Sequence, residues 1–142
     1  GYGVTYTGID GLTASYAMTD KETGTTSTSG DQTAWKLSYA YGPITVAASN
    51  NDYDVGTSSS DQETSSYKIS YTVSDELSVG YGVEEIEKGG SSTDAEYSAI
   101  TASYTAGGMT LSANIEEAEN VDHSTNNNAD VDYWFLGASF AF

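Results

Sequence analysis

Alternating side-chain polarity in the last stretch of the chain constrains the fold more than any other feature. In residues 131–142 the apolar residues recur at every second position, a period that puts them on one face of a β-strand. They are Trp134, Leu136, Ala138, Phe140 and Phe142. The intervening residues are mostly small or amphipathic. One face of this strand therefore suits hydrocarbon, while the other tolerates water.

The same two-residue period recurs along the whole chain and predicts nine strands joined as hairpins. Short turns are expected at residues 8–11, 42–43, 74–76 and 106–108, where Gly, Pro and Asp gather. Long polar loops are expected at 19–32, 50–64, 87–94 and 117–130. Short and long connections alternate strictly, as in outer-membrane barrels. In residues 95–105, Tyr97 and Ala99 fall on the parity opposite to Ile100, which leaves room for a β-bulge.

The amino-acid composition limits the kinds of partner that the chain can bind. The chain has 142 residues, enough for one domain, with 21 acids, four lysines, no arginine and a formal charge of -17. This charge disfavours nucleic acid and anionic inner-leaflet lipid and favours cations. The absence of cysteine excludes disulfides. A mean hydropathy of -0.41 and the lack of an apolar run near 18 residues exclude a transmembrane helix, whereas a barrel strand needs only about 9–11 residues.

The closing strand resembles the last strand of Gram-negative outer-membrane proteins, with its alternate apolar residues from Trp134 to the terminal Phe142. Its ending, GASFAF, is similar to that of the general porins of alphaproteobacteria. The resemblance implies that residues 1–142 are the C-terminal part of a 16-stranded porin barrel. It also implies a homotrimer, contact with outer-membrane lipid and lipopolysaccharide, and recognition of Trp134–Phe142 by the outer-membrane assembly machinery.

Nine strands is an informative count, because single-chain bacterial barrels have an even number. We therefore expect an all-β, antiparallel up-and-down barrel of which an N-terminal part is missing. One alternative is a small complete barrel of the eight-stranded type with a structural or adhesive role. A second alternative is a soluble acidic β-domain whose apolar rows pack against each other.

The face opposite the apolar rows is small and hydroxylated, and it is predicted to line a water-filled lumen. A lysine facing hydrocarbon would cost several kcal/mol, so the parity of Lys36 and Lys68 supports this assignment. Each lysine lies six residues before its turn, which predicts similar heights. The predicted pore-lining residues are Lys36, Ser38, Lys68, Ser70, Thr72, Glu84, Ser112, Asn114 and Glu116.

Porins set a basic wall patch against an acidic loop folded into the channel. By resemblance, Lys36 and Lys68 are candidates for that patch, although the patch of the family is usually arginine-rich. Acids are predicted at the loops, the upper strand ends and the pore mouth, since only Asp10, Asp75 and Glu76 fall in short turns. The mouth acids are predicted to be Glu84, Glu116 and Asp132. We therefore expect a weakly cation-selective passive channel for small hydrophilic solutes.

Aromatic residues on the apolar face are predicted to form two girdles at the membrane interfaces. The upper girdle contains Trp35, Tyr67 and Trp134. The lower girdle contains Tyr41, Tyr71, Phe140 and Phe142. At about 3.3 Å per residue along a tilted strand, their separation falls somewhat short of the expected apolar band of about 25 Å.

The sequence gives only weak support for catalysis or metal binding. His123, the single histidine, stands beside Asp122 in an acidic loop, but no nucleophile or second acid is placed by a motif, so no catalytic residue is predicted. The pairs Asp52/Asp54 and Asp130/Asp132 could hold divalent cations at the acidic loops. No cofactor and no dedicated metal site are expected.

Overall fold

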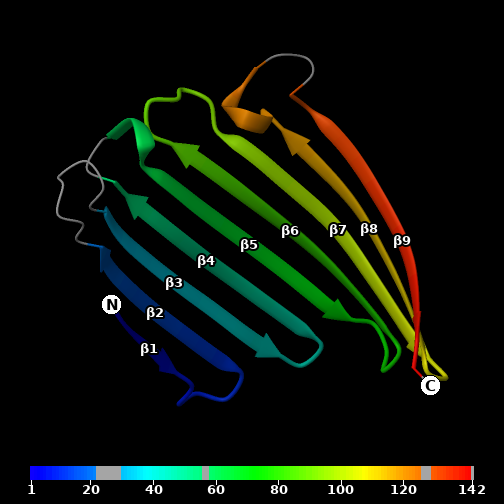
Figure 1. Ribbon diagram of the computed structural model, residues 1–142. Helices are drawn as coiled ribbons and strands as arrows, with labels where there is room; N and C mark the ends of the chain where they lie inside the picture. The colour runs from blue at the N-terminus through cyan, green and yellow to red at the C-terminus, as the bar shows by residue number, and fades with distance from the viewer. Residues whose placement is uncertain (22–29, 56–57, 126–128, 142) are drawn as a thin grey trace.

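The computed structural model shows a single antiparallel sheet of nine strands in sequential order (Figure 1). The structure describes residues 1–21, 30–55, 58–125 and 129–141. The strands are β1 (Tyr2–Tyr6), β2 (Leu12–Lys21), β3 (Gly30–Tyr41), β4 (Ile44–Asp54), β5 (Gln62–Thr72), β6 (Leu77–Lys88), β7 (Ala95–Ala106), β8 (Met109–Glu119) and β9 (Val131–Phe140). Two 3-10 turns, η1 (Ser58–Ser60) and η2 (Val121–His123), lie in the longer connections.

Each strand pairs with the next one along the chain, and the short connections gather at one end of the sheet (Figure 1). The β7–β8 turn shows the local cause. Gly107 and Gly108 have φ values of 59° and 80°, the paired positive φ that a two-residue hairpin turn requires and that glycine adopts without a steric penalty. The alternation of short turns and longer loops follows the sequence prediction.

The strands extend further into the polar stretches than the sequence predicted. β4 continues to Asp54 and β5 begins at Gln62, so most of the predicted loop 50–64 is paired backbone. There Asp52 stands directly opposite Glu63. The prediction was wrong here because ladder hydrogen bonds join backbone groups and continue where side chains change from apolar to charged.

Neither a bulge nor a register slip, both of which the sequence left possible, interrupts β7. The register runs unbroken from Leu77 opposite Tyr104 to Ile86 opposite Ala95. Tyr97 stands opposite Glu84 on one side and Ala118 on the other. It therefore shares a face with these residues, and the misleading parity reflects a tyrosine on the polar face rather than a slipped strand.

The sheet is strongly curved and has no apolar core of its own (Figure 1). Among the described residues, the buried apolar side chains are those of Ala95 and Ala129. Trp134 is 74% exposed and Leu136 is 68% exposed. An acidic soluble domain would bury such rows against each other, so the structure contradicts that alternative.

The sheet is also open. Within the described strands, β9 pairs with β8 alone and β1 with β2 alone, so these residues do not close into a small eight-stranded barrel. No helix in the described part of the chain has the length and apolarity needed to cross a membrane.

Candidate functional site

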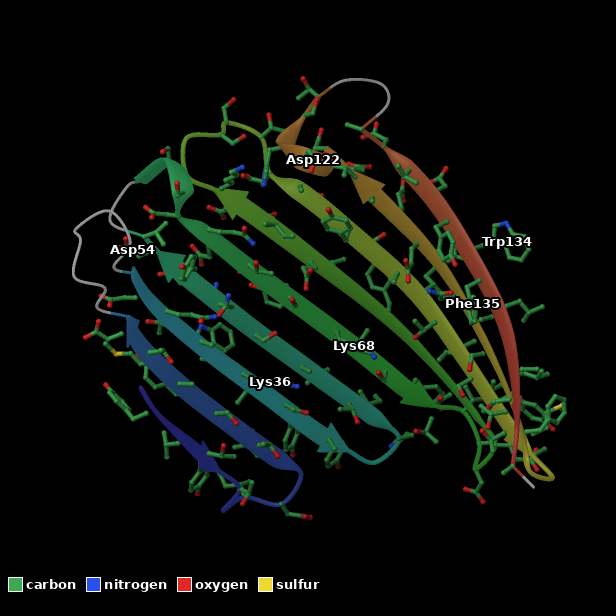
Figure 2. All side chains as sticks on the ribbon, viewed as in Figure 1. Lys36, Asp54, Lys68, Asp122, Trp134 and Phe135 are labelled. Atoms are coloured by element: carbon green, nitrogen blue, oxygen red, sulfur yellow. The ribbon has the colours of Figure 1, made fainter. Side chains whose placement is uncertain are left out.

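The strand register assigns every strand residue to one of two faces, because directly opposed residues of an antiparallel pair share a face. One row across the sheet shows the pattern, and it contains Ser38, Ala47, Lys68, Gly82, Ala99, Glu116 and Tyr133. In Figure 2, Lys36, Lys68 and Phe135 lie on the concave face, whereas Trp134 points away from it. We call this concave face, with the row above as its reference, the concave wall.

All nine predicted pore-lining residues lie on the concave wall. They occupy its successive rows: Lys36 and Glu84; Ser38, Lys68 and Glu116; Ser70 and Asn114; and Thr72 with Ser112. Lys36 and Lys68 stand in adjacent rows, close to the equal heights predicted from their distances to the turns. The wall between them and around them is built mostly from Ser, Thr, Ala and Gly.

The charged groups of the concave wall do not neutralise one another. Glu84 accepts a hydrogen bond from the hydroxyl of Ser66 at 2.7 Å, and Glu116 accepts one from the Nδ2 of Asn114. Among the described residues, neither Lys36 nor Lys68 has a carboxylate within ion-pairing distance. The two ammonium groups are therefore not engaged in ion pairs within the described part of the chain.

One predicted mouth acid lies on the other face. Asp132 stands directly opposite Glu117, which shares the convex face with Ile115 and Trp134. The prediction grouped Asp132 with Glu84 and Glu116, whereas Asp132 is two residues from Trp134 and must share its side of β9. The carboxylates on the concave wall of the described strands are those of Glu84 and Glu116.

Sequence reasoning missed four aromatic residues of the concave wall. Tyr97, Tyr133 and Phe135 lie on this wall, opposite Glu84, Glu116 and Asn114 respectively. Tyr53 shares it, because it stands opposite Gln32 and Gln62. The signal was present, because Tyr133 and Phe135 alternate with Trp134 and Leu136. The prediction treated that face as small and hydroxylated and gave these rings no role.

The predicted girdle residues share the convex face. Trp35, Tyr67 and Trp134 are 40%, 56% and 74% exposed there. Tyr41 and Phe140 lie near the short turns, and the ring of Tyr41 stacks on that of Tyr39 with centroids 6.5 Å apart. Tyr71 on β5 stands opposite Ile44 on β4, and Ile44 stands opposite Tyr41 on β3, so the three residues share one row. Phe142, the remaining residue of the predicted lower girdle, lies outside the described residues.

An acidic belt lies on the convex face, on the loop side of the apolar rows. Directly opposed acids occur at every strand pair from β2–β3 to β8–β9. We define the acidic belt as Asp20, Asp31, Asp52, Asp54, Glu63, Glu85, Glu87, Glu96, Glu117, Glu119 and Asp132. Sequence analysis placed these acids at the loops, the upper strand ends and the pore mouth, and it ended several strands too early to group them on one face.

Electrostatic repulsion from neighbouring acids affects Glu87, which lies four residues beyond Val83, the last apolar residue of β6 on the convex face. The carboxylate of Asp94, and next that of Glu63, raises the pKa of Glu87, with smaller contributions from desolvation and from Glu85. Like charges disfavour the ionised form of an acid, which is the direction observed.

The remaining predicted candidates have structural partners in the loops. The Nδ1 of His123 lies 3.1 Å from the carbonyl oxygen of Thr93, which ties η2 to the β6–β7 loop. Asp130 accepts a hydrogen bond from the backbone N–H of Asn120 at 3.1 Å. In the described part of the chain, no three acidic or histidine side chains are grouped as a metal site. Asp52 and Asp54 belong to the acidic belt.

The sequence of residues 2–142 matches the family model of the Gram-negative porins. The chain belongs to the Gram-negative porin family. A porin whose structure was refined at 1.8 Å resolution has a similar fold, with a TM-score of 0.73 and 18% sequence identity. The match covers 97% of this chain and 50% of that porin, so the chain spans about half the length of its structural relative. A search of curated proteins gives no significant match.

Two predictions are thereby confirmed: the all-β antiparallel up-and-down architecture of a porin, and a place in the outer membrane of a Gram-negative bacterium. This porin chain belongs to a family and fold of channels rather than of enzymes.

Proposed function

We propose that the protein forms a water-filled channel through which small hydrophilic solutes and ions diffuse passively, with weak selectivity for cations. The observation that carries the proposal is the segregation of the two faces. Apolar side chains cover the convex face between the short turns and the acidic belt, while the concave wall carries mainly small, hydroxyl, amide and charged groups with a few aromatic rings. A sheet with such faces separates lipid from water when it curves into a barrel.

The nine strands are proposed to form the C-terminal part of a larger barrel of about 16 strands, the size at which a barrel leaves an aqueous channel. Support comes from the open edges at β1 and β9 and from the match to half of a longer porin. A homotrimer, contact with lipopolysaccharide and recognition of the closing strand by the assembly machinery remain part of the same proposal, by family resemblance.

Weak selectivity follows from a near balance of charge on the concave wall. Among the described side chains of this wall, two carboxylates, those of Glu84 and Glu116, stand against three ammonium groups, those of Lys36, Lys68 and Lys88; Lys88 shares this face because it stands opposite Gln62. The excess of acid lies in the loops and the acidic belt, outside the wall. Its potential reaches the pore over a Debye length of about 8 Å in physiological salt, so it favours cations without excluding anions.

Reversal potentials of the full-length porin in a planar bilayer, measured across a KCl gradient, test the selectivity. A modest preference for K⁺ that grows as the salt is diluted is expected, because dilution extends the reach of the outer acids. A clear preference for Cl⁻ at low salt would mean that the wall lysines dominate the field and would overturn the selectivity. Absence of any stable conductance would overturn the channel itself.

A further inference from the structure

We propose that the concave wall carries a binding subsite for small neutral sugars, built across β5 to β9 around Phe135. The proposal rests on the proposed channel function, because the subsite lies on the face assigned to the lumen. It goes further by giving the wall a preferred class of solute.

A hollow of about 440 Å³ lies on the concave wall between β5 and β9. Its lining includes Lys68, Ser70, Gly80, Thr101, Asn114 and Phe135. The volume falls in the range of small-molecule sites. One cation, several hydroxyl groups, an amide and one aromatic ring therefore surround a space that a mono- or disaccharide can enter.

The floor of the hollow depends on a glycine. A Cβ atom at Gly80 would lie 2.9 Å from the Oγ1 of Thr101 and 3.3 Å from the Oγ of Ser70. Because Gly80 has no side chain, the two hydroxyl groups converge over β6. Two hydroxyls at one point can donate to and accept from neighbouring hydroxyls of a sugar ring.

Phe135 supplies an apolar platform at the edge of the hollow. It is 46% exposed, and its ring lies along β9 over Gly137, where a Cβ atom would be 2.5 Å from its Cζ. A phenyl ring on a water-facing wall loses the benefit of burial. Packing of the apolar C–H face of a sugar ring against it would restore that benefit while the sugar hydroxyls face the polar wall.

Asn114 adds a polar group beside the ring. Its Nδ2 donates to Glu116, and its Oδ1 is buried without a hydrogen-bond partner among the described residues. Buried polar atoms are nearly always paired. A turn of the amide toward the hollow would offer this acceptor to a solute hydroxyl.

The charges around the hollow favour a neutral solute over an anion. Lys68 has no ion-pair partner in the described part of the chain, yet Glu116 shares its row and Glu84 lies one row away on the same wall. Neither carboxylate belongs to the lining of the hollow, but an anion drawn to Lys68 would also be repelled by Glu84 and, from further away, by Glu116. A sugar instead accepts from the ammonium group and donates to a carboxylate, so it uses both signs of charge.

The test measures the ion current of the full-length porin in a planar bilayer while maltose is added. A saturable, reversible reduction of the current is expected. Phe135→Leu keeps most of the apolar volume but removes the ring face, and it should weaken the apparent maltose affinity roughly three- to tenfold. Phe140→Leu, on the convex face of the same strand, is the matched control and should leave the affinity unchanged.

Gly80→Ala provides an independent variant, because its methyl group displaces the Thr101 hydroxyl from the floor; it should also weaken maltose binding without loss of conductance. A conducting wild-type channel that maltose does not block saturably would overturn the subsite and leave the channel function intact. Equal affinity in Phe135→Leu and the wild type, or tighter block by glucuronate than by maltose, would also overturn it. No conductance in the wild type would instead refute the channel function on which the subsite rests.

Discussion

Leu37 and Ser38 are neighbours in β3, yet their side chains leave opposite faces of the sheet. Leu37 is 44% exposed on the convex face, and Ser38 stands opposite Ala47 on the concave wall. The same division separates Leu111 from Ser112 in β8. Adjacent residues thus meet different solvents, which makes the face assignment testable one side chain at a time.

Replacing Leu37 or Leu111 by Arg should lower the free energy of unfolding by about 2–4 kcal/mol, because neither water nor a partner is available in the hydrocarbon. The same change at Ser38 or Ser112 should be mild, since the guanidinium would remain in water. Urea unfolding in lipid vesicles measures the difference. An equal loss of unfolding free energy at the leucine and the serine positions would contradict the assignment of the two faces.

Glu87 makes the stability of the acidic belt dependent on pH. Its pKa is raised in the folded state by Asp94 and Glu63, so the folded chain binds this proton more readily than the unfolded chain. The free energy of unfolding should therefore rise as the pH falls from neutral through the raised pKa toward the ordinary glutamate range. Above that window Glu87 is ionised and the repulsion is fully present. Unfolding at low ionic strength as a function of pH should show this rise.

Glu87→Gln is the control for this effect, because it removes both the charge and the proton. The variant should be more resistant to unfolding at neutral pH and should show a smaller rise on acidification. High salt should reduce the difference between variant and wild type by screening the exposed charges. An unchanged pH profile would exclude Glu87 as a source of the dependence.

At the scale of the element, the sequence is most informative where one face is apolar. The alternation of Trp35, Leu37, Tyr39 and Tyr41 predicts β3 and its face, because only a period of two aligns these residues. The outer parts of β4 and β5 were not predictable in this way. There both faces are polar, and the strands persist through backbone pairing such as Asn51 with Thr64.

The concave wall shows the same limit for the candidate site. Its hydroxyl-rich rows could be predicted from parity, whereas the hollow beside Phe135 could not. It depends on the curvature of β5 to β9 and on a glycine whose neighbours belong to two other strands. The spacing of residues within one strand does not determine which residues lie close together across three strands.

The β7–β8 turn gives a prediction for one hairpin. Gly107 and Gly108 occupy the left-handed region with open space or only Ala141 O nearby, so a side chain there is opposed by backbone conformation rather than by contact. Gly107→Val or Gly108→Val should each cost roughly 1–2 kcal/mol. Gly82→Ala, whose added Cβ would have ordinary contacts in the extended strand, is the matched control. Urea unfolding should separate the turn variants from the control.

At the scale of the whole molecule, the predicted girdle residues and the acidic belt shift along the strands in a common direction, from which we infer how the strands are inclined. Trp134 stands in the same row as Tyr39, four residues along β3 from Trp35. Phe140 is likewise offset by four residues from the row of Tyr41. The acidic belt shifts in the same direction, from Asp31 opposite Asp54 to Glu117 opposite Asp132.

Residues at the same membrane depth lie on a line of constant height around a barrel. Because the strands are tilted, this line crosses the strand register obliquely. A shift of four residues over six strand spacings, or of six residues over five for the belt, corresponds to an inclination of roughly 25–40° at about 3.3 Å per residue and 4.8 Å per strand. Inclined in this way, the ten residues of β9 rise about 25–30 Å, close to the hydrocarbon thickness of a bilayer. The chemical boundary on the convex face thus records the angle at which the strands cross the membrane.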